Sequence, residues 1–325
     1  NLLLLTPSHP PMTDHIIITT FYTPPTHSCC FIAAHHLCML VDALLLMLDG
    51  QTGAGKTYTV VGPDGGGAQD EGLIPRVLRD LFRTIAGLQA QEAGDVSYNC
   101  KASICEIYQE QVRDLTATTT SSPRGKAANL QVRESLSRGV YVDGLTMHPI
   151  ETAEDAVALL RAGLVRRQVA ATNMNEVSSR SHSLFTLYVE SVERCGGLTR
   201  SKHSRFNLID LAGSERQKST QTQGVRLKEA SSINQSLSAL GNVIKALVDI
   251  CAGKSRHVHY RDSKLTFLLK DSLGGNSKTA IIANVSPDEA SLGETLSTLK
   301  FAQRAKRIQN VARVNDEVLG QSQQQ

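Results

Sequence analysis

Residues 46–60 read LMLDGQTGAGKTYTV, a short apolar run followed by a glycine-rich turn and the pair Lys56-Thr57. From Gly50 to Thr57 every position fits the pattern G-x-x-x-x-G-K-[ST]. Glycines let backbone N–H groups curl around phosphate oxygens where a side chain would clash. A helix that starts at this point directs its positive end at the same oxygens. The stretch therefore predicts a nucleotide site between a buried strand and a helix.

The phosphate loop is defined here by eight residues: Gly50, Gln51, Thr52, Gly53, Ala54, Gly55, Lys56 and Thr57. Lys56 is expected to reach the β- and γ-phosphates, and the Thr57 hydroxyl is expected to ligate Mg²⁺. The alternative is a chance match in an ordinary turn, which the flanking strand and helix signals disfavour. The loop alone does not identify the class of P-loop protein.

A second segment, residues 206–215 (FNLIDLAGSE), carries the other groups that a P-loop hydrolase needs. Asp210 follows a buried strand, the expected place for a carboxylate beside Mg²⁺. Gly213 comes three residues later, where an N–H can approach the γ-phosphate. The alternative reading is a strand that ends in a turn with a helix N-cap.

A third segment, residues 173–183 (NMNEVSSRSHS), is unusually rich in hydroxyls and amides. Ser178 and Ser179 are candidates to meet γ-phosphate oxygens and the metal. Arg180 could pair with Glu215, and such a pair would act as a latch if it formed in only one nucleotide state. The alternative is a polar loop built from caps and Asx-turns.

Composition sets limits on the other classes of function. The chain has 325 residues and a net charge of +3, so no overall field selects a polyanion such as nucleic acid. Seven cysteines without framework spacing indicate a reducing compartment. No apolar run approaches the roughly 20 residues of a membrane span. The start NLLLLTPSHPP lacks a basic region and a cleavage site, so we expect no signal peptide and a chain that begins inside a longer reading frame.

Strand and helix patterns alternate along the chain from residue 44, which predicts an α/β fold with helices on both faces of a mostly parallel or mixed central sheet. Two helices have clear starts, one with Pro75 in its first turn and one capped by Thr152 with Asp155 three residues on. Residues 1–43 are atypical, with at most a strand or two. We expect a core domain over 44–309 and a separate tail over 310–325, its end disordered.

Several motifs together resemble kinesin motor domains. They are GQTGAGKTYT, NEVSSRSH and DLAGSE, with EIYQEQVRDL, SSINQSLSALGNVIKAL, HVHYRDSKLTFLLKDSLGGNSKTAIIANVSP and ETLSTLKFAQRAKRI, so the resemblance covers residues 46–315. It is strongest to the class-twelve kinesins of spindles and phragmoplasts. The resemblance implies the P-loop NTPase-type kinesin fold, with residues 173–183 as the switch I segment and residues 206–215 as the switch II segment.

The implied activity is microtubule-stimulated hydrolysis of ATP with Mg²⁺. By the resemblance, Ser178, Ser179, Asp210 and Gly213 respond to the γ-phosphate, while Arg180 and Glu215 form the latch that holds the attacking water. The metal ligands would be Thr57, Ser179 and, through water, Asp210. Tyr58 resembles the aromatic residue that stacks on adenine, although it could simply be a surface residue of its helix.

A basic face is also implied to bind an acidic filament, with attraction that weakens as salt rises. The alternative is a solvated basic loop. We define the basic face by these residues: Lys218, Arg226, Lys228, Lys254, Arg256, His257, His259, Tyr260, Arg261 and Lys264. The expected partner is the microtubule, with no nucleic acid and no membrane insertion, in the cytoplasm and cytoskeleton. A homodimer would require a stalk outside this chain.

Residues 310–316 (NVARVND) resemble a neck linker placed as in plus-end-directed kinesins. The sequence also departs from the family, since residues 1–43 contain no R-x-R-P segment to pack on adenine and LMLDGQT replaces the usual FAYGQT. One alternative is therefore a microtubule-binding module with impaired motility. Another is a P-loop enzyme of a different kind, such as a nucleotide kinase, which the two switch-like segments disfavour.

Overall fold

The computed structural model describes residues 16–20, 43–63, 70–91, 95–117, 129–136, 138–172, 177–195, 198–215, 225–310 and 316–319. Side chains are described for these residues except 16–20, 169–172, 177–178, 195, 225–234 and 316–319. Residues 64–69 and 118–128 lie outside the described residues, as does the end of the tail.

Within the described residues, nine strands form a central sheet in the order β1-β10-β2-β9-β8-β3-β4, with β11 paired to β9 and β7 paired to β3. The strands run over these bounds: β1 Ile16–Thr20, β2 Ala43–Asp49, β3 Val96–Tyr108, β4 Gln111–Asp114, β7 His148–Ile150, β8 His182–Cys195, β9 Leu198–Asp210, β10 Lys278–Val285 and β11 Asp316–Leu319. A separate hairpin joins β5 (Gln131–Ser135) to β6 (Gly139–Asp143).

The sheet is mixed, as the sequence predicted. Strand β2 is parallel to both of its neighbours, β10 and β9, whereas β9, β8, β3 and β4 pair antiparallel in succession. All seven residues of β2 are buried, which explains its continuous apolar run, because a central strand with helices on both faces has no solvent side. Its carboxyl end is Asp49, directly before the phosphate loop.

The sequence allowed a strand or two within residues 1–43 without placing them, and β1 lies in this segment. It pairs antiparallel with β10 at the edge of the sheet, with Ile16 opposite Val285 and Thr20 opposite Ile281. The edge of the sheet beside β10 is therefore occupied by a segment that the family resemblance did not cover.

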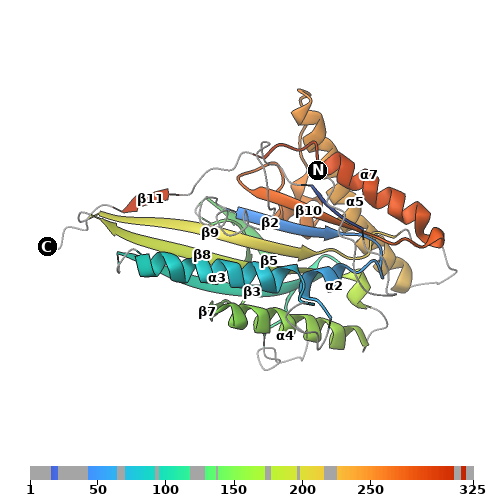
Figure 1. Cartoon of the computed structure of the whole chain (residues 1–325). Helices are drawn as coiled ribbons and strands as arrows, with labels where there is room; N and C mark the ends of the chain where they lie inside the picture. Colours follow the sequence, from blue (N-terminus) through green and yellow to red (C-terminus); the bar gives the residue numbers. More distant parts are fainter. Residues whose placement is uncertain are drawn as a thin grey trace.

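Helices cover both faces of the sheet (Figure 1). Helices α3 (Leu73–Gln91) and α4 (Ala153–Thr172) lie on one face, and α5 (Val225–Cys251) and α7 (Leu292–Ala305) lie on the other. Two apolar cores form, one that includes residues of α3 and α4 and one that includes residues of α5. Short α2 (Lys56–Val61) contributes Val60 to the first core, and α6 (Lys264–Leu268) contributes Leu265 to the second. Single turns of 3₁₀-helix occur at Val177–Arg180, Tyr260–Asp262 and Glu289–Ser291. None of the helices in the described part has the length and apolar character needed to cross a membrane.

Helix α4 starts with the capping box that the sequence predicted. The Asp155 N–H donates to Thr152 Oγ1 at 3.1 Å, and the Thr152 N–H donates to Asp155 Oδ2 at 2.9 Å. Two N–H groups that the first helical turn leaves unpaired are satisfied in this reciprocal way. The start of α4 is thereby fixed, and α4 runs from this cap toward the switch I segment.

Candidate functional site

The phosphate loop turns sharply between β2 and α2, and its glycines are required by the geometry. A Cβ added to Gly50 would lie 2.2 Å from the carbonyl oxygen of Asn284 in β10, so a side chain has no space there. Gly55, which precedes α2, has a φ of 84°, a conformation that costs other residues energy. The strand, loop and helix therefore form the phosphate cradle expected from the sequence pattern.

Lys56 lies inside this loop. Its Nζ donates to the carbonyl oxygens of Gly50 at 2.6 Å and Gln51 at 3.0 Å. Burial lowers the pKa of Lys56, while the carboxylates of Asp210 and Glu215 act in the opposite direction. The ammonium group is thus held against the loop by carbonyl oxygens and nearby carboxylates, where a phosphate would compete for it.

Thr57 and Asp210 come together as a metal site requires. Thr57 Oγ1 lies 3.5 Å from Asp210 Oδ2, although the two residues are 153 positions apart in the chain. Asp210 Oδ1 is buried and has no hydrogen-bond partner among the described residues. A hydroxyl and a carboxylate oxygen are hard ligands of the kind that Mg²⁺ uses alongside phosphate and water. The residues therefore fit the predicted ion.

A buried arginine, which was not predicted from the sequence, lies beside Asp210. Arg167 of α4 places Nη1 2.8 Å from Asp210 Oδ2, and both side chains are only 6% exposed. The same guanidinium donates to the Ser181 hydroxyl and carbonyl oxygens and to the Ser183 hydroxyl. Arg167 thus joins α4, the end of the switch I segment and Asp210. In the sequence Arg167 is one of two adjacent arginines on a predicted helix, and nothing there distinguishes it from Arg166.

Backbone hydrogen bonds join the three phosphate-sensing segments. The Gly213 N–H donates to the Ser179 carbonyl oxygen at 2.8 Å, and the Ser214 N–H donates to the Gly50 carbonyl oxygen at 3.2 Å. Switch II is therefore bonded to switch I on one side and to the phosphate loop on the other. A displacement of the switch II backbone must therefore break these hydrogen bonds or move switch I and the phosphate loop with it.

Glu215 contacts the phosphate loop. Its carboxylate accepts from the Thr52 N–H at 2.8 Å and from the Thr52 hydroxyl at 2.6 Å. Gly213 leaves the space for this contact, since a Cβ there would lie 2.2 Å from Glu215 Oε2. The Arg180–Glu215 latch stays a prediction. Arg180 and Ser179 lie in the 3₁₀ turn Val177–Arg180, directly before β8.

Other predicted residues of the switch and adenine regions are placed less fully. The Ser178 side chain, together with Asn173 and Asn175, lies outside what the structure describes. Tyr58 is on α2 with 53% of its surface exposed, so its ring is accessible for stacking. Its role toward adenine stays a prediction.

Asp49 is a further ionisable group next to the loop. It is 3% exposed at the end of β2, and burial raises its pKa to about 6, opposed by the nearby charge of Lys56. The aspartate stands where the family usually has tyrosine, in FAYGQT. An ionised Asp49 is costly in this position because few polar groups replace its lost water.

The loop and switch II also contact helix α7. Gln51 Nε2 donates to Ser291 Oγ at 2.9 Å at the start of α7. The hydroxyls of Ser214 and Thr298 lie 3.5 Å apart, about two helical turns further along α7. Since the chain leaves α7 toward the predicted neck linker, these contacts place the nucleotide loop and the neck at opposite ends of one helix.

Much of the basic face is paired with acidic side chains. Lys254 and Arg256 both contact Asp249, at 2.9 and 3.2 Å. Arg261 contacts Glu134 of β5 at 3.0 Å. At Lys264 it is the backbone N–H, not the ammonium group, that donates to Glu110 Oε2 at 2.6 Å.

The remaining members of the basic face differ in how far they are described. Tyr260 Oη donates to the Leu273 carbonyl oxygen, and the rings of His257 and His259 meet edge to face. Lys218 lies outside the described residues, and Arg226 and Lys228 are on α5 with undescribed side chains. Filament binding by this set stays a prediction.

The chain after α7 is anchored and then pairs with the sheet. Asn310 Oδ1 accepts from the Gly274 N–H at 2.8 Å, and Asn310 Nδ2 donates to the carbonyl oxygens of Ser272 and Ser277. Beyond it, β11 runs antiparallel to the first residues of β9, with Asp316 opposite Lys202 (Figure 1). Residues 311–315, the middle of the predicted neck linker, lie outside the described residues.

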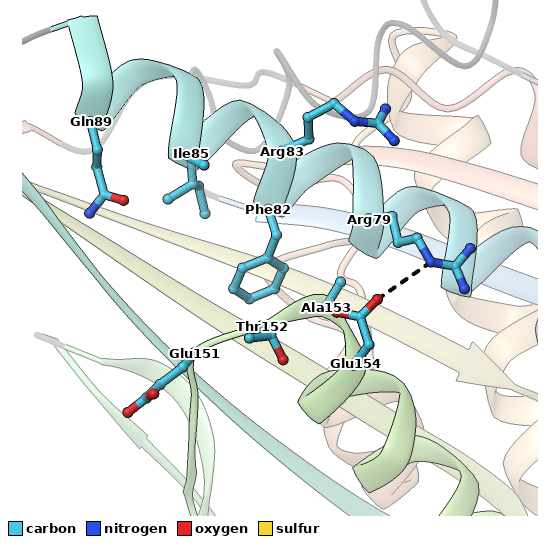
Figure 2. Close-up of a pocket in the computed structure, with 10 residues that line it drawn as sticks. Arg79, Phe82, Arg83, Ile85, Gln89, Glu151, Thr152, Ala153 and Glu154 are labelled. Carbon is cyan, nitrogen blue, oxygen red and sulfur yellow. Dashed lines mark ion pairs between the residues drawn. The ribbon is translucent and has the colours of Figure 1, made fainter.

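A hollow of about 330 Å³ lies between α3 and the start of α4 (Figure 2). Phe82 is among the residues that line it, and two further lining residues, Arg79 and Glu154, form an ion pair with an N–O distance of 3.6 Å. None of its lining residues belongs to the phosphate loop or to either switch segment.

Comparison with known proteins agrees with this geometry. The family model for the kinesin motor domain matches residues 43–308. A solved structure titled as that of a fast kinesin superimposes with a TM-score of 0.74 and 43% identity, covering 86% of this chain and 75% of the other. A second, KIF14 with AMP-PNP in complex with a microtubule, gives a TM-score of 0.76 and 41% identity over 88% of this chain and 77% of the other.

Curated relatives include class-twelve kinesins, as the sequence predicted. Kinesin-like protein KIN-12C of Arabidopsis thaliana is 53% identical over 277 residues, which is 83% of this chain and 13% of the relative. Kinesin-like protein KIF15 of Strongylocentrotus purpuratus is 52% identical over 83% of this chain and 18% of its own length. The chain thus spans less than a fifth of these relatives. With the matched family model, this identity establishes that the chain belongs to the kinesin motor domain family.

Proposed function

We propose that this chain is a microtubule-dependent motor ATPase that hydrolyses ATP with Mg²⁺. The observation that carries the proposal is the meeting of three distant segments at one point. Thr57 of the phosphate loop lies 3.5 Å from Asp210, and the Gly213 N–H of the same switch II segment bonds to Ser179 of switch I at 2.8 Å. A nucleotide with a γ-phosphate is the ligand that all three segments could contact at once.

The chemistry proposed is in-line attack by water on the γ-phosphorus, with cleavage of the bond to the oxygen that bridges to the β-phosphate. The products are ADP and inorganic phosphate. Lys56 neutralises charge on the β- and γ-phosphates, and the loop N–H groups hold them in place. Ser178, Ser179 and Gly213 bind γ-phosphate oxygens, while Arg180 and Glu215 orient the water. The protein acts through positioning and electrostatics, without a covalent intermediate.

Thr57 would hold Mg²⁺ directly together with Ser179, and Asp210 would hold it through water. The ion, when bound, neutralises the charge that develops on the phosphates. Arg167 keeps the Asp210 carboxylate in place, because the buried guanidinium donates to Oδ2, while Oδ1 has no hydrogen-bond partner among the described residues.

Coupling to the filament is proposed through α5, which follows switch II in the chain. The basic face between α5 and α6 would meet the acidic filament, and Lys254, Arg256 and His257 at its centre are exposed. Residues 310–316 would act as the neck linker, and the pairing of β11 with β9 supports a docked position. The position of this segment after the core favours plus-end-directed movement in the cytoskeleton, including spindles or phragmoplasts.

The division into domains is proposed in the same way: an atypical segment over 1–43, a motor domain over 44–309 and a neck-like segment with a tail over 310–325. A homodimer would form through a stalk outside this chain. Tyr58, exposed on α2, is proposed to stack on adenine.

A second candidate is a microtubule-binding module with impaired motility. It is favoured by the N-terminal departure from the family, where β1 pairs antiparallel at the sheet edge and no R-x-R-P segment is present to pack on adenine. In this case filament binding would remain while turnover or stepping would fail.

The test is steady-state ATP turnover with and without polymerised tubulin, for the wild type, Lys56→Ala and Lys101→Ala. Lys101 is an exposed lysine of β3 and serves as the matched control. We expect tubulin to raise turnover in the wild type and the control, and Lys56→Ala to abolish it. A turnover rate that tubulin does not change would contradict the proposed motor function. Turnover that persists in Lys56→Ala would contradict the assignment of the nucleotide site. Surface-gliding assays with polarity-marked filaments then separate the motor from the second candidate and give the direction.

A further inference from the structure

His182 is a buried titratable residue that the mechanism above does not use. It is the first residue of β8, directly after the switch I turn, and is 3% exposed. Both ring nitrogens are engaged. The Ala212 N–H donates to Nδ1 at 2.9 Å, and Nε2 lies 2.8 Å from the Ser236 hydroxyl oxygen.

The first of these contacts fixes the tautomer. A backbone N–H can only donate, so Nδ1 must accept and the proton of the neutral ring must sit on Nε2. Nε2 therefore donates to Ser236 Oγ. Burial, together with the nearby charges of Arg167 and Lys56, lowers the pKa of His182 to about 3, so the ring stays neutral across the physiological range.

The two partners belong to different functional elements. Ala212 lies in switch II, between Asp210 and Gly213, and Ser236 lies on α5 and is also 3% exposed. Leu211 of switch II and Leu240 of α5 also belong to one apolar core. Apolar side chains can slide past one another at little cost, but a hydrogen-bonded ring fixes both distance and direction.

We infer that His182 is a positioning residue that couples the placement of α5 to the backbone of switch II. This inference rests on the proposed function, in which α5 carries nucleotide state to the filament. When the Ala212 backbone moves with switch II, the ring transmits that movement to Ser236. Since the backbone of His182 stays in β8 while its ring can turn about the side-chain bonds, α5 shifts relative to the sheet.

If His182 had a purely structural role, its replacement would have a different effect. Removing its contacts would lower the stability of the protein and leave the dependence of filament affinity on nucleotide unchanged. The quantity that separates the two roles is the ratio of the microtubule Kd in ADP to the Kd in a non-hydrolysable ATP analogue.

Two substitutions isolate the contact to α5. Ser236→Ala removes the hydroxyl partner and leaves the bond between His182 and Ala212 in place. His182→Asn retains an acceptor for the Ala212 N–H but is too short to reach Ser236. Ser238→Ala is the matched control, since Ser238 is an exposed serine two residues further along α5.

The experiment is microtubule co-sedimentation of each variant in both nucleotide states, with thermal unfolding measured in parallel. We expect Ser236→Ala and His182→Asn each to reduce the Kd ratio about fivefold, the factor that one neutral hydrogen bond contributes. The double variant should lose no more than either single variant, because both remove the same bond. Ser238→Ala should match the wild type.

A Kd ratio that stays at the wild-type value in folded Ser236→Ala would overturn the inference while leaving the proposed function intact. If His182→Asn does not fold, Ser236→Ala decides the question alone. If the microtubule Kd of the wild-type chain is the same in both nucleotide states, the proposed function is wrong, and the inference fails with it.

Discussion

Arg167 and Asp210 form a buried ion pair, with Arg167 Nη1 2.8 Å from Asp210 Oδ2 and each side chain 6% exposed. The pair connects α4 to the strand end that precedes switch II. Since Asp210 Oδ1 has no partner among the described residues, the guanidinium neutralises the carboxylate and leaves one oxygen available.

The first prediction concerns this pair. Arg167→Met leaves Asp210 buried without its cation and should lower the free energy of unfolding by about 3 to 5 kcal/mol. Adding Asp210→Asn to Arg167→Met should recover part of that loss, because the uncompensated charge is gone. Urea denaturation measures both effects. Arg161→Ala, an exposed arginine on the same helix, should change stability by less than about 0.5 kcal/mol. Equal losses in the single and double variants would contradict the pairing.

The second prediction is a pH dependence caused by Asp49. Its pKa is raised from 3.8 to about 6, so the folded protein binds this proton more tightly than the unfolded chain does. The free energy of unfolding contributed by Asp49 therefore decreases as the pH rises from about 4 to about 6. Between pH 5 and pH 7.5, the wild type should lose about 1 kcal/mol relative to Asp49→Asn.

Urea denaturation of both proteins at pH 5, 6 and 7.5 without nucleotide checks this prediction. The contribution of His182 is common to the two proteins and cancels in their difference. Parallel stability profiles for the wild type and Asp49→Asn would show that Asp49 does not retain its proton in the folded state.

The third prediction tests the start of α4. Thr152→Ala removes the oxygen that accepts the Asp155 N–H and should cost about 1 kcal/mol of stability. Thr152→Ser keeps the hydroxyl and should stay close to the wild type. The measurement is the denaturation midpoint at constant m-value. Identical midpoints for the alanine and serine variants would mean that the capping box contributes nothing.

The fourth prediction concerns the basic face. Asp249 pairs with both Lys254 and Arg256, so Asp249→Asn should free two cations and tighten microtubule binding. The double change Lys254→Ala and Arg256→Ala should weaken binding several-fold and reduce its dependence on salt. Stability should hardly change, since surface pairs contribute little.

Co-sedimentation across a salt series measures these effects. Arg83→Ala provides the control, as an exposed arginine on α3 at the opposite face of the sheet. If Asp249→Asn weakens binding as much as the double variant does, this loop does not face the filament.

Local features of the fold were predictable from the sequence, because each depends on neighbours in the chain. The phosphate loop follows from glycine and lysine spacing, and the α4 cap follows from Thr152 and Asp155. The buried β2 follows from its apolar run. The mixed character of the sheet was also foreseen, although the order of its strands was not.

Features that depend on distant pairing were not predictable in the same way. Arg167 lies 43 positions from Asp210, and nothing nearby in the sequence distinguishes it from Arg166. The contact of Glu215 with Thr52 spans 163 positions and was not predicted, while the pairing of Glu215 with Arg180 stays a prediction. Asp249 lies beside the basic loop in sequence, yet whether it neutralises that loop depends on side-chain directions that only the fold determines.

The most direct measurement of the central claim is the ratio of ATP turnover with saturating polymerised tubulin to turnover without it, for the wild-type chain with Mg²⁺. We predict a rise of at least about tenfold, equivalent to about 1.4 kcal/mol off the barrier of the limiting step. A ratio of one, in a chain that binds nucleotide, would contradict the account that the phosphate loop, the switches and α5 act as one filament-coupled ATPase.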